Sequence, residues 1–285
     1  MSRTLKIIII LTILIIIIGL VGILISENIH NDIYVKLSAP SQKYVYIIGI
    51  SQYQDDYQGF TLGSKDAVKI KSFLVESAKF KTNNTRLLVD SEAKNAQIKN
   101  DLKSYSKAVS PNDLLMIYYS GHGDRIKTSE NGKSEYQYIL CPYDETSDHA
   151  NSLSGKEFQS LVKNINAKNL VFIFDSCNSG GMIEDLTANN TFSNRYVILA
   201  SCEENESSVG DEELGGGVFT YFLLEAFTKP EADRDQDGWI SIEEAFIYAR
   251  PLTIKNCDFF GDSQHPMIFD GNPQVEIELV KLKNS

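Results

Sequence analysis

Two reactive side chains, His122 and Cys177, each follow a strongly apolar run of the sequence, LLMIYY at 114–119 and LVFIF at 170–174. A thiol attacks as its thiolate, and a nearby imidazole either lowers the thiol pKa or takes its proton. Glycines close to both residues leave room for a substrate and expose backbone N–H groups that can hold an oxyanion. These features predict nucleophilic catalysis by a cysteine–histidine dyad, provided that both residues reach one edge of a sheet.

The elements that must position this pair form an alternating pattern. Short β-branched and aromatic runs predict strands at 44–50, 85–89, 114–119, 136–140, 170–174 and 196–200. Apolar residues at helical spacing predict helices near 67–74, 93–109, 154–165, 218–227 and 241–250. Uniformly apolar strands indicate a parallel sheet that is buried on both faces. We therefore expect one α/β domain of three layers over residues 44–285, mainly parallel, with its site beyond the carboxyl ends of the strands.

Composition narrows the classes of function. The chain has 285 residues, a formal net charge of −11 and an isoelectric point near 4.9, so no nucleic acid is expected as a partner. Four cysteines are too few for a disulfide-dense scaffold, and Cys141, Cys202 and Cys257 include at most one disulfide. His149 and His265 lie in polar loops without the spacing of metal ligands.

The first residues predict a membrane anchor. Residues 7–26 carry no charge; a transmembrane helix needs about 20 apolar residues, whereas the apolar part of a cleaved signal peptide has about 7–15. We expect a retained single-pass anchor in the lipid bilayer of the cell membrane, with signal cleavage and secretion as the alternative. Arg3 and Lys6 place residues 1–6 on the cytoplasmic side and the catalytic domain outside. Residues 27–43 are polar without a period and are expected to form a tether.

Six stretches of the chain resemble the caspase-like cysteine peptidases, which include caspases, metacaspases and many prokaryotic relatives. They cover nearly all of residues 44–230 in order, namely YVYIIGI with Tyr53, LGSKDA, MIYYSGHGD, FIFDSCNSGG, YVILASCEENESS and GGGVFTYFLLEAF. His122 precedes Cys177 by 55 residues, close to the spacing of about 50 in caspases. The resemblance implies Cys177 as nucleophile, His122 as general base and acid, and the Gly123 and Cys177 amides as oxyanion hole. It implies hydrolysis of peptide bonds in protein or peptide substrates through an acyl-enzyme.

The predicted substrate pocket departs from caspases toward metacaspases. Caspases carry Gln-Ala before the cysteine, whereas this chain has Asp175 and Ser176; metacaspases carry an acid there and prefer Arg or Lys before the scissile bond. Asp66 and Ser120 match an acid and a serine of that pocket. Carboxylates in a narrow cleft favour a guanidinium or ammonium group, so we expect cleavage after Arg or Lys. Two alternatives stay open: a legumain-like endopeptidase or transpeptidase acting after Asn, and a catalytically silent caspase-fold module that binds calcium.

Residues 233–244 fit the 12-residue calcium loop of an EF-hand, with Asp at positions 1, 3 and 5, Gly at 6, Ser at 9 and Glu at 12. The predicted ligands are the carboxylates of Asp233, Asp235, Asp237 and Glu244, the carbonyl of Trp239 and the hydroxyl of Ser241. Ca²⁺ takes about six to eight oxygen ligands. We expect Ca²⁺ as a cofactor that braces the fold, with a regulatory role as the alternative.

Overall fold

The computed structural model describes residues 39–55, 62–130, 133–188 and 196–282. The fold described below is that of the unit formed by residues 38–285. The predicted cytoplasmic segment, the predicted anchor and most of the predicted tether lie outside the described residues. Within the described ranges, no helix is both long and apolar enough to cross a bilayer.

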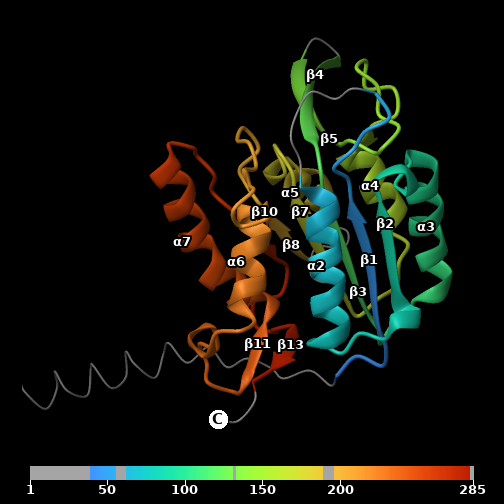
Figure 1. Ribbon diagram of the computed structural model, residues 1–285. Helices are drawn as coiled ribbons and strands as arrows, with labels where there is room; N and C mark the ends of the chain where they lie inside the picture. Colours follow the sequence, from blue (N-terminus) through green and yellow to red (C-terminus); the bar gives the residue numbers. More distant parts are fainter. Residues whose placement is uncertain (1–38, 56–61, 131–132, 189–195, 283–285) are drawn as a thin grey trace, which may run out of the picture. The chain divides into compact units, whose positions relative to one another are not determined.

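A sheet with the strand order β12-β8-β7-β3-β1-β2 forms the centre of the domain (Figure 1). Its strands are β1 (Lys43–Gly49), β2 (Thr85–Val89), β3 (Leu114–Ser120), β7 (Asn169–Asp175), β8 (Tyr196–Ala200) and β12 (Met267–Asp270). Neighbouring strands are parallel, except that β12 is antiparallel to β8. Five of the six predicted strands are thereby confirmed as members of this sheet.

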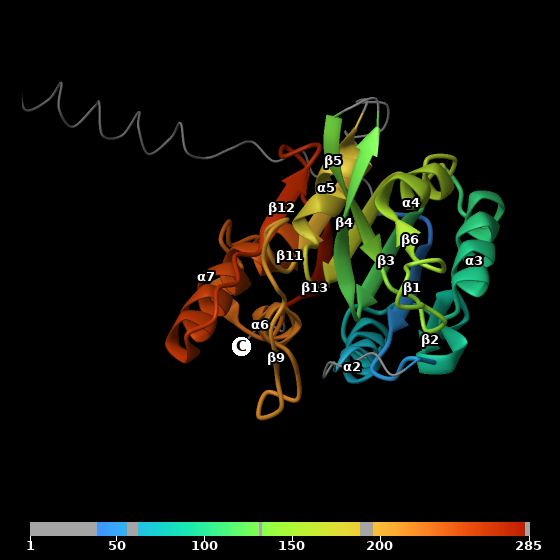
Figure 2. The same cartoon turned by 90° about the horizontal axis from the view of Figure 1, so that it is seen from above.

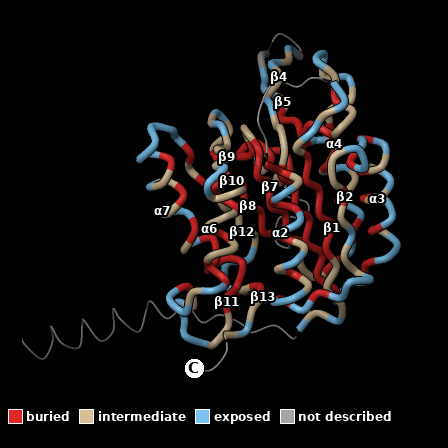
Figure 3. The backbone as a smooth tube through the Cα atoms, in the orientation of Figure 1, coloured by how far each residue is buried: buried red, intermediate tan, exposed pale blue. Residues whose placement is uncertain are grey.

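Helices cover both faces of the sheet (Figures 1 and 2). One face carries α2 (Gly63–Glu76), α6 (Val218–Ala226) and α7 (Ile242–Phe260), and the other carries α3 (Asn95–Ala108), α4 (Gly155–Val162) and α5 (Gly180–Thr187). Side chains alternate along β1, so that Val45 and Ile47 join the first core while Tyr46 and Ile48 join the second. The strands are buried between the two helical layers (Figure 3). The predicted three-layer α/β fold with a mainly parallel sheet is confirmed.

The polar segment after His122 forms a hairpin that the sequence pattern did not predict. β4 (Gly123–Glu130) pairs antiparallel with β5 (Lys133–Leu140), which also pairs with β6 (Leu153–Ser154). Only the end of β5 was predicted, because β4 has a single large apolar residue, Ile126, and therefore no apolar face. The hairpin extends beyond the end of the main sheet (Figure 1). Its first strand begins directly after His122, at the edge where the site is expected.

The C-terminal part contains short strands and one long helix. The strand pairs are β9 (Gly210–Asp211) with β10 (Gly216–Gly217), and β11 (Trp239–Ser241) with β13 (Glu278–Lys281). The helix predicted to end at 250 continues as α7 to Phe260, with Pro251 inside it. A proline in a helix costs roughly 3 kcal/mol, and burial of Ala249, Thr253 and Cys257 along one face of α7 offsets that cost.

Candidate active site

The ends of β3 and β7 open into a cavity of about 100 Å³. Ser120 at the end of β3 is the register partner of Asp175 at the end of β7, so the two loops that follow these strands begin side by side. The predicted residues that line this cavity are Asp66, Ser120, His122, Asp175 and Cys177. The structure thus brings both members of the predicted dyad and all three predicted pocket residues to one cavity.

Gly123 lies where the histidine loop meets the cysteine loop. A Cβ atom at Gly123 would lie 2.5 Å from the carbonyl oxygen of Cys177 and 2.8 Å from Oγ of Ser176. Real Cβ atoms do not approach other atoms so closely, so this position requires glycine. The loop that carries His122 therefore packs directly against the loop that carries the thiol.

The His122 backbone is held by two tyrosines. Its N–H donates to the Tyr53 hydroxyl at 2.6 Å, and its carbonyl accepts from the Tyr119 hydroxyl at 2.7 Å and from the Cys141 N–H at 3.1 Å. The Tyr53 ring also packs against the imidazole, with 4.9 Å between the centroids and an angle of 34° between the ring planes. Burial lowers the pKa of His122, with the charge of Asp124 opposing it, which favours the neutral imidazole that can accept a proton.

Cys177 lies half-buried in the turn between β7 and α5. The next residue, Asn178, adopts a left-handed conformation with φ of 58°, which asparagine tolerates better than most residues. Its N–H donates to the Glu206 carbonyl at 2.8 Å and its side-chain amide to the Glu204 carbonyl at 2.9 Å. No disulfide joins any of the four cysteines, so the disulfide considered from the sequence is not formed, and the three cysteines other than Cys177 are at most 1% exposed.

Asp66, in the first turn of α2, contributes a buried carboxyl to the cavity. The side chain is 1% exposed, and its Oδ2 accepts from the Gly217 N–H at 2.9 Å and from the Ser120 hydroxyl at 3.1 Å. Oδ1 is buried and accepts no hydrogen bond from the described residues. Burial, followed by the negative charge of Asp175, raises the pKa of Asp66 to about 7. A cation in the cavity would favour the ionised form of this carboxyl.

Asp175 is 4% exposed and is bonded more completely. Oδ1 accepts from the Ser208 hydroxyl at 2.5 Å, and Oδ2 accepts from the Thr220 hydroxyl at 2.6 Å and from the Thr220 N–H at 3.2 Å. Burial raises the pKa of Asp175, and the bonds from Ser208 and Thr220 oppose this rise. The sequence analysis did not identify Ser208 and Thr220, because a single Ser or Thr forms no motif. The available signal was that both residues lie in stretches that resemble the caspase-like peptidases.

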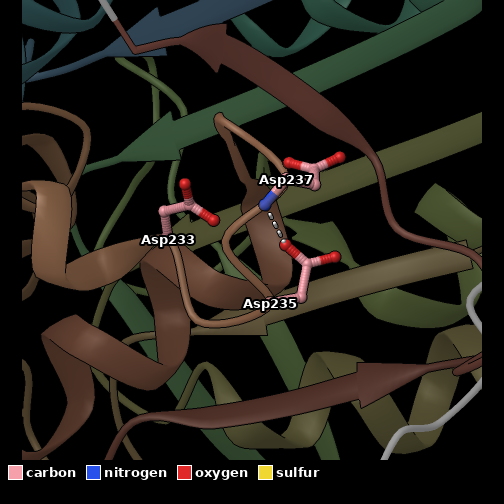
Figure 4. Close-up of side chains that lie close together, drawn as sticks. All are labelled: Asp233, Asp235 and Asp237. Carbon is pink, nitrogen blue, oxygen red and sulfur yellow. Dashed lines mark hydrogen bonds between the residues drawn. The ribbon is translucent and has the colours of Figure 1, made fainter. Parts of the chain in front are cut away.

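The predicted calcium loop brings three carboxylates together (Figure 4). Asp233, Asp235 and Asp237 each place one oxygen so that all three oxygens lie within 4.8 Å of one another. Left-handed conformations at Gln236 and Gly238, with φ of 61° and 87°, turn the chain around this point. Asp233 Oδ1 is buried and has no hydrogen-bond partner among the described residues. Three hard oxygen donors in one tight loop fit a Ca²⁺ ion.

The remaining predicted ligands lie beside this cluster. Ser241 and Glu244 form a capping box at the start of α7, in which each side chain accepts from the other's N–H, at 3.1 and 3.0 Å. Glu244 also accepts from the Arg234 N–H at 2.6 Å, so its carboxyl lies against the start of the loop. Trp239 begins β11. Burial, followed by the charge of Glu244, raises the pKa of Glu276 to about 7, so a further acid lies near these predicted ligands.

Known proteins resemble this chain in sequence. Residues 42–268 match the family model of the caspase domain. Metacaspase-4 of Arabidopsis thaliana is 27% identical over 151 residues, which cover 50% of this chain and 35% of that protein. Metacaspase-5 of Trypanosoma cruzi is 31% identical over 108 residues, which cover 36% of this chain and 24% of that protein. The chain therefore spans about a third or less of the length of these relatives.

Two solved structures share the fold at low identity. Protein GSU0716 from Geobacter sulfurreducens aligns with a TM-score of 0.57 at 17% identity, covering 81% of this chain and 94% of that chain. Caspase-1 from Spodoptera frugiperda aligns with a TM-score of 0.58 at 12% identity, covering 88% and 95%. At these identities the likeness concerns the fold alone. Because the family model matches well over half of the sequence, and the fold agrees with it, the chain belongs to the caspase domain family.

Proposed function

We propose that this chain is a cysteine endopeptidase that acts through Cys177 and His122. The observation that carries the proposal is that both residues line one cavity, and that their loops pack together at Gly123. In the first step, His122 takes the thiol proton and Cys177 Sγ attacks the carbonyl carbon of the scissile bond. The N–H groups of Gly123 and Cys177 would then donate to the oxyanion, as the resemblance implies.

The second half of the reaction uses the same two side chains. The imidazolium of His122 gives its proton to the leaving amine, the C–N bond breaks and a thioester to Cys177 remains. His122 then takes a proton from water as the oxygen attacks the thioester carbon. The C–S bond breaks to release a carboxylic acid, and the Cys177 thiolate regains a proton from the imidazolium. A base for both steps must be neutral at working pH, and the lowered pKa of His122 meets this requirement.

Covalent labelling tests the nucleophile. A peptidyl acyloxymethyl ketone should modify Cys177 alone, because the other three cysteines are at most 1% exposed. Cys177→Ala should abolish the labelling, and His122→Ala should slow it by roughly 100-fold or more, the usual contribution of a general base. Cys141→Ala, which keeps the backbone N–H and carbonyl of that buried residue, is the matched control and should label normally. A folded protein that neither labels nor cleaves peptides would instead be the catalytically silent caspase-fold module.

The pocket supports cleavage after Arg or Lys. Asp66 and Asp175 place two buried carboxyls at the cavity, and both have raised pKa values that a bound cation would lower. An asparagine side chain, the legumain-like alternative, carries no charge and would not favour the ionised form of either carboxyl. Fluorogenic peptides that end in Arg, Lys, Asn or Asp distinguish basic specificity from the legumain-like alternative. Faster cleavage after Asn or Asp than after Arg would contradict the proposed basic specificity.

The second proposal is a calcium site at residues 233–244, supported by the convergence of three carboxylates. A ligand that binds only the folded state at 100 times its Kd stabilises the fold by about 2.7 kcal/mol. Calcium should therefore raise the melting temperature, and Asp235→Asn or Asp237→Asn should remove the increase. Asp211→Asn, which alters an aspartate that caps a turn elsewhere, is the matched control. No increase in millimolar calcium would refute the site, and parallel activity assays distinguish a structural role from a regulatory one.

We propose finally that residues 7–26 anchor the protein in the cell membrane, with the catalytic domain outside. The support is the uncharged length of that run and the preceding Arg3 and Lys6. Protease added to intact cells should then remove the domain. Complete protection of the domain would overturn this orientation, and recovery of a shortened protein from the medium would favour the secreted alternative.

A further inference from the structure

A buried amide, Gln264, connects the segment after α7 to one wall of the active-site cavity. The side chain is 0% exposed, and every one of its hydrogen-bonding positions is used. Its Oε1 accepts from the Val209 N–H at 2.8 Å and from the Cys257 thiol at 3.5 Å. Its Nε2 donates to the Ser201 carbonyl at 2.9 Å and to Ser208 Oγ at 3.4 Å. The amide cannot turn over without losing several of these bonds at once.

The bond from Gln264 sets the direction of the Ser208 hydroxyl. A serine hydroxyl has one proton to donate. Because Ser208 Oγ accepts from Gln264, its own proton is free to be donated to Asp175 Oδ1, which lies 2.5 Å away. The three side chains form a directed chain of hydrogen bonds that ends on a carboxyl of the substrate pocket. Ser208 and Val209, both bonded to Gln264, line the cavity themselves.

Ser263 and His265, the residues on either side of Gln264, form hydrogen bonds with Glu206 in the loop that contains Ser208. The Glu206 carboxylate accepts from the His265 N–H at 2.7 Å and from the Ser263 hydroxyl at 2.9 Å, and His265 Nδ1 lies 2.6 Å from it. The Glu206 carbonyl in turn accepts from the N–H of Asn178, which follows Cys177 in the chain. The segment after α7 therefore supports both the pocket wall and the turn that carries the nucleophile.

We propose that Gln264 is a positioning residue for substrate specificity: it holds Ser208 so that the Asp175 carboxyl keeps the orientation that receives a guanidinium or ammonium group. The proposal rests on the proposed peptidase function. Gln264 contacts neither the reacting atoms nor His122 in the hydrogen bonds described above, so its loss should alter the binding of the cationic side chain more than the chemical step. KM for an arginine substrate should rise while kcat changes little.

Benzamidine, a small amidine cation, tests the pocket without catalysis. Its Kd is measured in the Cys177→Ala background for Gln264→Met, for Ser208→Ala and for the two combined. Each single change should raise Kd about five- to tenfold, the usual effect of one lost or misdirected hydrogen bond. Since Gln264 acts through Ser208, the Kd of the double variant should be no higher than that of Ser208→Ala alone. In the active protein, the ratio of kcat/KM for arginine and citrulline peptides should fall by the same factor.

The controls separate this proposal from the peptidase itself. Gln159→Met, which removes an amide bonded to the Leu186 and Ala188 carbonyls, should leave benzamidine binding unchanged. If Gln264→Met does not melt cooperatively, Gln264→Asn takes its place, because the shorter amide cannot reach the same four partners. A Kd equal to that of the parent, or effects of Gln264 and Ser208 that multiply, would overturn the proposal. Altered benzamidine binding in a protein that cleaves no peptide would overturn the peptidase and leave the positioning role standing.

Discussion

Removing the charge of Asp66 should stabilise the free protein at pH 8 and weaken its attraction for cations. Burial and the charge of Asp175 raise the pKa of Asp66 from 3.8 to about 7. Because each pKa unit corresponds to about 1.36 kcal/mol, the ionised carboxyl costs the folded state about 4 kcal/mol. Asp66→Asn keeps an oxygen for the Gly217 and Ser120 donors and removes this cost.

The sign of the pH dependence follows from the raised pKa. Below about pH 4 the carboxyl is protonated in both states, and Asp66 contributes no pH-dependent cost. Between about pH 4 and pH 7 the unfolded state ionises while the folded state stays protonated, so stability falls as pH rises. Above pH 7 the loss is complete. Other groups titrate as well, so the difference between the variant and the wild type isolates Asp66.

Thermal unfolding at pH 5 and pH 8 measures this difference. The gain from Asp66→Asn should be about 2 kcal/mol at pH 5 and about 4 kcal/mol at pH 8, and each kcal/mol corresponds to roughly 2–4 °C in a domain of this size. Asp113→Asn is the matched control, since Asp113 is 2% exposed and accepts from the Gln42 and Ser110 N–H groups. It should destabilise the protein at both pH values, because backbone donors lose a charged acceptor.

The functional consequence has the opposite sign. An ionised Asp66 attracts a cationic side chain, so KM of the wild type for an arginine peptide should fall as pH rises through 7. Asp66→Asn should lose that dependence and bind the arginine peptide more weakly at pH 8. If the variant melts at or below the wild-type temperature at pH 8, with the same pH profile, Asp66 does not carry the buried ionisation cost and the reasoning is refuted.

Three further changes test other contacts of the site. Tyr53→Phe removes the acceptor of the His122 N–H but keeps the ring that packs against the imidazole, so kcat/KM should fall roughly two- to tenfold. Unchanged kinetics would show that the hydroxyl has no role. Gly123→Ala places a Cβ 2.5 Å from the Cys177 carbonyl, so labelling of the thiol should slow at least about tenfold, as an inhibitor-labelling time course would reveal. Glu244→Ala removes the side chain that accepts from the Ser241 N–H in the capping box, so stability without calcium should fall by about 1 kcal/mol; a melting curve in chelator that matches the wild type would contradict it.

The fold was predictable where a short stretch carries its own signal. The stretches LLMIYY and LVFIF are uniformly apolar because β3 and β7 are buried on both faces. Both strands were therefore predicted from the sequence. β4 was missed because its exposed hairpin needs no apolar face. The end predicted for the helix near 241–250 was wrong: α7 continues past Pro251 to Phe260, and burial of Ala249, Thr253 and Cys257 along one face offsets the cost of the proline.

The sequence by itself determined that a thiol and an imidazole follow two buried strands, and that acids accompany them. Only the tertiary structure decided which groups surround these acids. Ser208 and Thr220 bond Asp175 from 33 and 45 residues away, and Gln264 reaches Ser208 across 56 residues. Hydroxyl and amide residues occur throughout the chain, and the type of such a residue does not predict its hydrogen-bond partner. Their partners are set by the register of the strands and by the packing of α6 and α7 on the sheet, which no local pattern of residues contains.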